Sequence, residues 1–151
     1  MNQLSTARDR ALGAFHGLAL GDALGMPTQS LSREQIRARY GRIDGLIAAD
    51  ADQPIAPNMP AGAITDDTEQ AMLVGELLVA GQGHIDPTGL AQRLIDWEAA
   101  MRAKGSQDLL GPSTKRAIEM ILDGASPEQA GRFGTTNGCL LYTSDAADER
   151  S

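Results

Sequence analysis

The sequence predicts an all-α protein, and three observations support that prediction. Several segments carry apolar residues at three- and four-residue spacing, with a Ser, Thr or Asp before the segment and a glycine after it. These are the signals of amphipathic helices with defined ends. No segment shows a convincing alternation of apolar and polar residues, as a half-buried strand would. Aromatic residues are only 3% of the chain, so a core must rest on aliphatic and small side chains, which suit close helix packing.

Two helices are predicted in the first 41 residues. Thr6 can cap the first helix, which ends near Gly25. Its apolar residues fall on one face: Leu12, Phe15, Ala19 and Ala23. Residues 32–35 read Ser-Arg-Glu-Gln, a capping-box pattern that opens a short second helix through Arg39, and Gly41 stops it.

Residues 41–64 are predicted to be irregular. Pro54, Pro57 and Pro60 stand too close together for any helix, because proline lacks the backbone N–H that a helix interior needs. A loop of this length inside a compact domain is more often functional than idle.

Two longer helices follow the loop. Residues 67–80 form the first of them, and glycines at positions 81 and 83 end it. Asp86 followed by Pro87 is a cap with proline at the first helical position, and it begins the second. The apolar face of this helix contains Leu90, Leu94, Trp97 and Met101.

Two shorter helices complete the predicted set. Ser113 or Thr114 begins a helix that runs through Leu122 and stops at Gly124. Residues 126–129 read Ser-Pro-Glu-Gln and open a short last helix. The sequence contains no internal repeat, and it indicates no domain boundary before Gly138.

Composition and charge exclude several classes of partner. With 151 residues, 42% hydrophobic and 22% charged, the chain is ordinary globular protein and long enough for one core. A formal charge of −7 and a pI near 4.7 oppose binding to nucleic acid, which requires clustered Lys and Arg, and to anionic membranes. No run approaches the length of a membrane-spanning helix.

The expected compartment is the cytoplasm. The single cysteine, Cys139, can form no internal disulfide. Arg8, Asp9 and Arg10 interrupt the first 20 residues, which therefore lack the apolar core of a signal peptide. Nothing in the sequence points to secretion.

Residues 64–70 read Ile-Thr-Asp-Asp-Thr-Glu-Gln, with two adjacent carboxylates at the start of an apolar helix. Oxygens of this kind are preferred by Mg²⁺, Mn²⁺ or Ca²⁺, and the absence of Cys and His here argues against zinc. If Thr65 and Asp66 lie in the non-helical entry and Asp67 opens the first turn, their oxygens can converge. Helix capping is the alternative, because Asp and Thr are favoured N-caps and Asp67 with Gln70 fits a capping box.

A second segment, residues 15–27, reads Phe-His-Gly-Leu-Ala-Leu-Gly-Asp-Ala-Leu-Gly-Met-Pro. It ends an apolar helix in closely spaced glycines that allow close approach of a backbone or ligand. Leu-Leu-Gly-Pro-Ser-Thr follows at 109–114 and Gly-Thr-Thr-Asn-Gly at 134–138. In this order, and with the Thr-Asp-Asp run, these segments resemble the ADP-ribosylglycohydrolase family, which includes dinitrogenase reductase-activating glycohydrolase and the ADP-ribosyl-acceptor hydrolases.

The resemblance implies a compact multi-helix fold, of which this chain is the N-terminal half. It also implies a binuclear Mg²⁺ or Mn²⁺ centre that hydrolyses an N- or O-glycosidic bond at the anomeric carbon of ADP-ribose. The metal ligands carried over to this sequence are Thr65, Asp66 and Asp67. The substrate would be a small ribosyl or ADP-ribosyl compound or an ADP-ribosylated protein. The family's other ligands come from a distant Asp-x-Asp-Thr motif, which this sequence does not contain.

Residues 139–151 depart from the family pattern. Members continue the Thr-Asn-Gly stretch with small residues and then Met-Arg, whereas this chain reads Cys-Leu-Leu-Tyr-Thr-Ser-Asp-Ala-Ala-Asp-Glu-Arg-Ser. That run resembles translated sequencing-adapter sequence. We therefore expect a partial domain over residues 1–138 and a non-native tail over residues 139–151. The alternative is a genuine short acidic C-terminus.

The resemblance also points to residues that bind substrate. Asp22, at the end of the first helix, is expected in the ligand pocket, with hydrogen bonding to nearby backbone as the alternative. Asn137 and Gly138 could cradle a phosphate with backbone amides, although any turn uses the same residue types. Gln29 stands where many members carry a glutamate. Its amide can hydrogen-bond a ribose hydroxyl but cannot accept a proton.

The catalytic residue implied is Asp108, which would assist deprotonation of the attacking water; a solvated loop carboxylate is the alternative. Prenyl synthases that bind Mg²⁺-diphosphate through helical aspartates are a rival class, but their second acidic run and aromatic-lined cavity are missing here. A non-catalytic ADP-ribose or nucleotide-binding module stays open, because Gln29 and the missing ligand motif both weaken catalysis. With half of a binuclear site, the chain as given is expected to be inactive.

Overall fold

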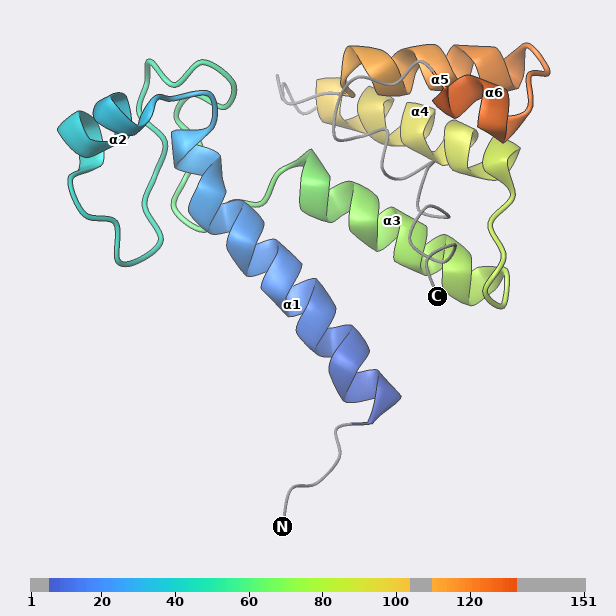
Figure 1. Cartoon of the computed structure of the whole chain (residues 1–151), viewed down its shortest axis with the longest axis horizontal. Coiled ribbons are helices and arrows are strands. Elements are labelled where there is room, and N and C mark those ends of the chain that lie inside the picture. Colours follow the sequence, from blue (N-terminus) through green and yellow to red (C-terminus); the bar gives the residue numbers. More distant parts are fainter. Residues whose placement is uncertain (1–5, 104–109, 133–151) are drawn as a thin grey trace. The chain divides into compact units, whose positions relative to one another are not determined.

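The computed structural model describes residues 6–103 and 110–132, and within these ranges it contains helices and no strand. The prediction of an all-α fold is confirmed (Figure 1). The chain divides into two compact units, Met1–Met72 and Leu73–Ser151, with the division inside one helix.

The first unit begins with three helical elements: α1 (Ala7–Gly25), the single 3₁₀ turn η1 (Met26–Thr28) and α2 (Arg33–Tyr40). Thr6 forms the predicted cap of α1, as a capping box in which it exchanges hydrogen bonds with Asp9. The predicted capping box of α2 is also present. Gly41 ends α2 with a φ of 62°, in the left-handed region that glycine enters without steric cost.

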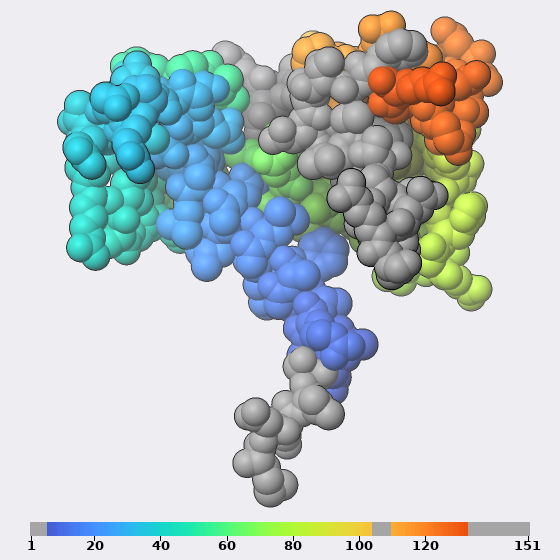
Figure 2. Space-filling view, viewed as in Figure 1, coloured from blue at the N-terminus to red at the C-terminus, as the bar shows by residue number. Residues whose placement is uncertain are grey.

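Helix α1 is exposed along most of its length, as its blue atoms show in Figure 2. Of the predicted apolar face, Leu12 is 46% and Phe15 37% exposed, whereas Ala23 is buried at 4%. Only the C-terminal end of α1 therefore enters the core of the first unit.

The core of the first unit is small. Its buried residues are Met26, Ala49 and Ala56, with Met59 and Ala63 packed against them. The segment between α2 and α3 is irregular, as predicted, and it supplies four of these five residues. Three alanines and Met59 of this loop thus pack around Met26, where α1 meets η1.

Helix α3 (Asp66–Ala80) begins one residue earlier than predicted, because Thr65 rather than Asp66 occupies the entry position. At its other end the backbone N–H of Gly81 donates to Leu77 O and that of Gly83 donates to Leu78 O, each at 2.8 Å. These bonds satisfy carbonyls that the end of a helix would otherwise leave without partners.

The second unit contains the rest of α3 together with α4 (Pro87–Ala103), α5 (Pro112–Leu122) and α6 (Pro127–Gly131). Proline at the first position and Gly111 as N-cap start α5 one or two residues before the predicted place. The caps predicted for α4 and α6 are both present.

A continuous aliphatic core fills the second unit. Among the described residues, its nine buried members are Leu73, Leu90, Ala91, Leu94, Leu110, Ala117, Ile118, Ile121 and Ala130. Trp97 packs against this core and is partly buried, which fits the predicted apolar face of α4. In the part of the chain that the structure describes, no helix combines the length and hydropathy needed to cross a membrane.

Candidate metal and ligand site at the start of helix α3

Thr65 lies directly before α3 and acts as its N-cap. Its hydroxyl oxygen accepts the backbone N–H of Asp67 at 3.3 Å, and its carbonyl accepts the backbone N–H of Glu69 at 3.2 Å. The first bond satisfies an amide of the first turn that has no partner within the helix, and the second is the first i→i−4 bond of α3. Thr65 is only 2% exposed, so its hydroxyl is fixed in a buried position.

The two adjacent carboxylates have different surroundings. Asp66, the first residue of α3, is partly buried, and its Oδ2 accepts a hydrogen bond from Gln70 Nε2 at 3.0 Å. Asp67 is exposed. The N-cap of α3 is thus Thr65 and not Asp67, and the Gln70 side chain bonds to Asp66. The capping box considered for Asp67 and Gln70 is therefore not the arrangement found.

Asp22 lies in the last turn of α1 and reaches the start of α3. Its Oδ2 accepts the Thr65 backbone N–H at 2.8 Å and the Thr68 hydroxyl at 2.5 Å, and its Oδ1 accepts the Thr65 hydroxyl at 2.7 Å. Thr68 is as deeply buried as Thr65, at 2% exposed. All three residues belong to the first unit. The structure therefore brings together two segments that are 43 residues apart in the sequence.

Oxygen donors at this place fit one side of a hard-cation site. Carboxylate and hydroxyl oxygens are the ligands that Mg²⁺, Mn²⁺ and Ca²⁺ prefer, and such ions take six or more. Within residues 6–103 and 110–132, no group of three or more His, Cys, Asp and Glu is arranged to hold a metal. Thr65, Asp66 and Asp67 can thus contribute part of a coordination shell, and further oxygens are needed to complete it.

The glycines of α1 leave open space around this helix. A Cβ added at Gly17, Gly21 or Gly25 would meet no described atom within 4 Å outside the helix's own backbone. Among the described residues, no other backbone makes the close approach that these glycines would allow, and the approach of a ligand stays a prediction.

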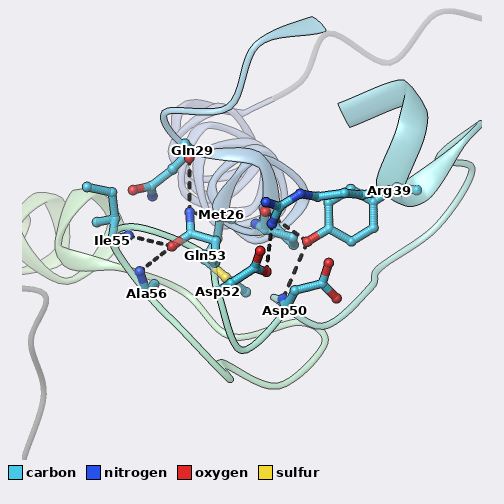
Figure 3. A network of polar contacts seen from close by, with 10 residues as sticks. Met26, Gln29, Arg39, Asp50, Asp52, Gln53, Ile55 and Ala56 are labelled. Carbon is cyan, nitrogen blue, oxygen red and sulfur yellow. Dashed lines mark hydrogen bonds and ion pairs between the residues drawn. The ribbon is translucent and has the colours of Figure 1, made fainter. Parts of the chain in front are cut away.

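Gln29 follows η1, and a buried glutamine from the loop holds its backbone. Gln53, 2% exposed, donates its Nε2–H to the carbonyl of Gln29 at 3.0 Å. Its Oε1 accepts the backbone N–H groups of Ile55, at 2.6 Å, and Ala56. Figure 3 shows Gln53 between these groups, linking the loop to the segment that carries Gln29. The position of Gln29 is thus fixed through its main chain.

Two further contacts connect helix α2 to the loop. Arg39 forms an ion pair with Asp52 at 2.7 Å, also drawn in Figure 3. The Tyr40 hydroxyl donates to Pro27 O at 3.3 Å and accepts the Asp50 backbone N–H at 3.4 Å. These contacts hold the irregular segment against the end of α1.

Three predicted site residues, Asp108, Asn137 and Gly138, lie outside the described residues. Conversely, Thr68 and Gln53 were not singled out from the sequence, although the structure gives both a central place. The repeat of threonine in Thr-Asp-Asp-Thr is a signal that could have drawn attention to Thr68. Gln53 stands in the Pro- and Ala-rich loop, where no pattern distinguishes it.

The described residues thus form an all-helical fold with oxygen donors at the start of one helix, and comparison with known proteins identifies the family. The family model described as ADP-ribosylglycohydrolase matches residues 3–147. The chain belongs to this family, so the resemblance seen in the sequence is confirmed. The matched range passes Gly138 into the segment for which a non-native tail is predicted.

Three relatives illustrate the similarity. The uncharacterized protein YegU of Escherichia coli is 33% identical over 136 residues, covering 90% of this chain and 40% of the relative. ADP-ribosyl-[dinitrogen reductase] glycohydrolase of Rhodospirillum rubrum is 36% identical, covering 61% of this chain and 29% of the relative. An ADP-ribosylarginine hydrolase of Serratia proteamaculans is 29% identical, with 84% and 34% covered. The chain spans about two fifths of the length of the first of these relatives.

Proposed function

We propose that this chain is part of a metal-dependent hydrolase that cleaves an ADP-ribosyl or related ribosyl glycosidic bond. The names of two relatives support the bond type, since one acts on ADP-ribosylarginine and another on ADP-ribosyl-dinitrogen reductase. A small ADP-ribosyl compound or an ADP-ribosylated protein in the cytoplasm is the corresponding substrate. The observation that carries the proposal is the set of oxygen donors of Thr65, Asp66 and Asp67 at the start of α3.

In the proposed mechanism, Thr65, Asp66 and Asp67 hold part of a binuclear Mg²⁺ or Mn²⁺ centre. Such a centre, when bound, supplies a water of lowered pKa and orients substrate hydroxyls. Gln29 can donate or accept a hydrogen bond at a ribose hydroxyl, but its amide cannot take a proton. Asp108 is the proposed acceptor of the proton from the attacking water. Asp22, Asn137 and Gly138 are proposed as residues that bind the substrate.

The proposal includes the inactivity of these 151 residues by themselves. The sequence contains no Asp-x-Asp-Thr motif, and the described residues supply only part of a coordination shell. Activation of water depends on ions held in fixed geometry. We therefore expect weak Mn²⁺ binding without turnover.

Calorimetric titration with Mn²⁺ tests the site. The variants are Asp66→Ala and Asp67→Ala, and the matched control is Asp86→Ala, which removes a carboxylate that caps α4 instead. Removal of either α3 carboxylate should greatly weaken Mn²⁺ binding, while the control should bind as the wild type does. Equal Mn²⁺ affinity in all four proteins would leave these residues with the structural role alone.

The second candidate function is a module that binds ADP-ribose without hydrolysing it. Glutamine at position 29, in place of the acid that many members carry, favours it. Titration of ADP-ribose, combined with an assay for its release from ADP-ribosylated arginine in Mn²⁺, separates the two functions. Turnover above that of a Thr65, Asp66 and Asp67 triple-alanine variant would reject both the binding module and the expected inactivity.

A further inference from the structure

Asp22 forms several hydrogen bonds within the candidate site, although the sequence predicts only that it lies in the ligand pocket. Its two carboxylate oxygens accept three hydrogen bonds, all from Thr65 and Thr68. Both threonines are buried, so the exchange of these bonds for water is disfavoured. The carboxylate is therefore oriented by α3, and it orients the α3 hydroxyls in return.

The Thr65 hydroxyl has one proton and two lone pairs, and the structure accounts for all but one of these. The proton goes to Asp22 Oδ1 at 2.7 Å, and one lone pair accepts the Asp67 backbone N–H at 3.3 Å. Among the described residues, no hydrogen-bond donor meets the second lone pair. A hydroxyl with no fixed acceptor is free to rotate and to present its proton to a ligand. Because that proton is donated to Asp22, the Thr65 oxygen can offer a ligand only its remaining lone pair.

We propose that Asp22 is a positioning residue that holds the Thr65 hydroxyl as a ligand for a hard cation, an inference that rests on the metal site of the proposed function. Asp22 acts through Thr65 and does not itself bind the cation. The two Asp22 oxygens act as acceptors in all three hydrogen bonds, and this arrangement directs the proton of the Thr65 hydroxyl toward Asp22. Partners of this kind orient the groups that hold a metal, and their loss weakens affinity about 10- to 100-fold.

Thr68 is the second anchor of this arrangement. Its hydroxyl donates to the same Asp22 oxygen that accepts the Thr65 backbone N–H, so it fixes the carboxylate from the first turn of α3. Thr68 is not among the proposed metal ligands. A variant at Thr68 therefore disturbs the orientation of Asp22 without removing an oxygen from the site.

A simple tether between α1 and α3 would use the same hydrogen bonds, and the two roles differ in one consequence. A tether acts on stability whether or not Thr65 has a hydroxyl. A positioning residue acts on metal affinity only through that hydroxyl, so its effect disappears when the hydroxyl is absent. A double-mutant cycle measures this difference.

The experiment measures the Mn²⁺ affinity of the full 151-residue chain by calorimetry and by the EPR signal of free Mn²⁺. The variants are Asp22→Asn, Thr65→Val and their combination. Asp86→Asn is the matched control, because its carboxylate accepts the Gly89 N–H at 2.8 Å at the start of a different helix. Circular dichroism without metal records the helicity and the unfolding temperature of each protein.

The expected result is Mn²⁺ binding that is about 10- to 100-fold weaker in Asp22→Asn and unchanged in Asp86→Asn. In the Thr65→Val background, Asp22→Asn should cause no further loss. Losses that add in the double variant, or unchanged affinity in a folded Asp22→Asn, would overturn the positioning role. If Asp22→Asn does not keep the helicity of the wild type, Thr68→Val replaces it in the cycle, and an unchanged affinity there overturns the role equally.

Failure of the metal site gives a different pattern. If the wild type does not bind Mn²⁺, or Asp66→Ala binds it as tightly as the wild type, the proposed site is rejected and the inference with it. If Asp66→Ala loses affinity while Asp22→Asn keeps it, only the role of Asp22 is rejected.

Discussion

The two compact units differ in the kind of internal contact that stabilises each of them. Among the described residues, the core cluster of the first unit has only three buried members, and polar side chains, Asp22 and Gln53, join segments of this unit that are distant in sequence. The described part of the second unit has nine buried apolar residues in one continuous core. Hydrogen bonds are directional, whereas burial of apolar area is not. The unit that carries the candidate site is therefore the one in which geometry is specified most closely by individual bonds.

The largest expected effect of a single change is in the apolar core of the second unit. Leu94 is 1% exposed, so Leu94→Ala should destabilise this unit by about 2–5 kcal/mol through lost burial and the cavity left behind. Urea unfolding monitored by the fluorescence of Trp97, which packs against this core, measures the change. The control Leu78→Ala, at a residue 41% exposed, should have a much smaller effect. Equal effects of the two variants would contradict a core built on Leu94.

A smaller effect is expected when the side-chain hydrogen bonds of Gln53 in the first unit are removed. Gln53→Ala leaves the buried amides of Ile55 and Ala56 without their acceptor, at a cost of about 1–3 kcal/mol. Hydrogen exchange should accelerate at these two amides, while amides of α4 keep their protection. The exposed Gln92→Ala is the matched control. Faster exchange in both units alike would show that they do not differ in the way described.

The ion pair between Arg39 and Asp52 should contribute less again. Asp52 is 70% exposed in its side chain, so solvent screens the pair, and a coupling of about 0.2–1 kcal/mol is expected. A double-mutant cycle with Arg39→Ala and Asp52→Ala, read from urea unfolding by circular dichroism, measures it. The coupling should fall as salt is added. A coupling that is large and independent of salt would contradict the expectation that solvent screens this ion pair.

The smallest effect concerns pH at the start of α1. The side-chain and backbone hydrogen bonds from Thr6 lower the pKa of Asp9 from its ordinary value of 3.8. Because the pKa is lower in the folded state, the ionised carboxylate stabilises the helix fully when the pH is above the ordinary pKa of 3.8. This stabilisation is lost as the pH falls through the pKa of the folded state. NMR titration of the Asp9 carboxyl carbon checks the direction. In Thr6→Ala, the pKa of Asp9 should return toward 3.8; a pKa unchanged by this substitution would rule out the cap as its cause.

Most helix boundaries could be predicted because each depends on a few consecutive residues. The capping boxes at Thr6, Ser32 and Ser126 each join residues three positions apart, so the sequence contains both partners side by side. The start of α3 was misplaced by one residue, because several adjacent side chains can cap a helix there and the choice depends on the surroundings. In the structure Thr65 is the cap, and its hydroxyl also donates a hydrogen bond to Asp22, a residue distant in sequence.

For the candidate site, the sequence predicts residue types and a chemistry that stays a prediction, but it does not predict the contacts between the segments. Two adjacent carboxylates beside threonines indicate a hard-cation site by residue type alone. The contact of Asp22 with Thr65 and Thr68 is a different matter, since nothing local in either segment specifies the other. The same holds for Gln53, whose contact with the Gln29 carbonyl crosses 24 residues of sequence.

The sequence by itself determined the all-α class, the family, most helix ends and the oxygen-bearing residue types at positions 65–67, because these follow from residue types at short spacing. Only the tertiary structure decided which hydroxyl is committed to Asp22, which loop residue holds Gln29, and how much of the α1 face stays exposed. The physical reason is that long-range contacts depend on the path of the whole chain. A side chain's chemistry sets what it can bind, while the fold sets what lies within its reach.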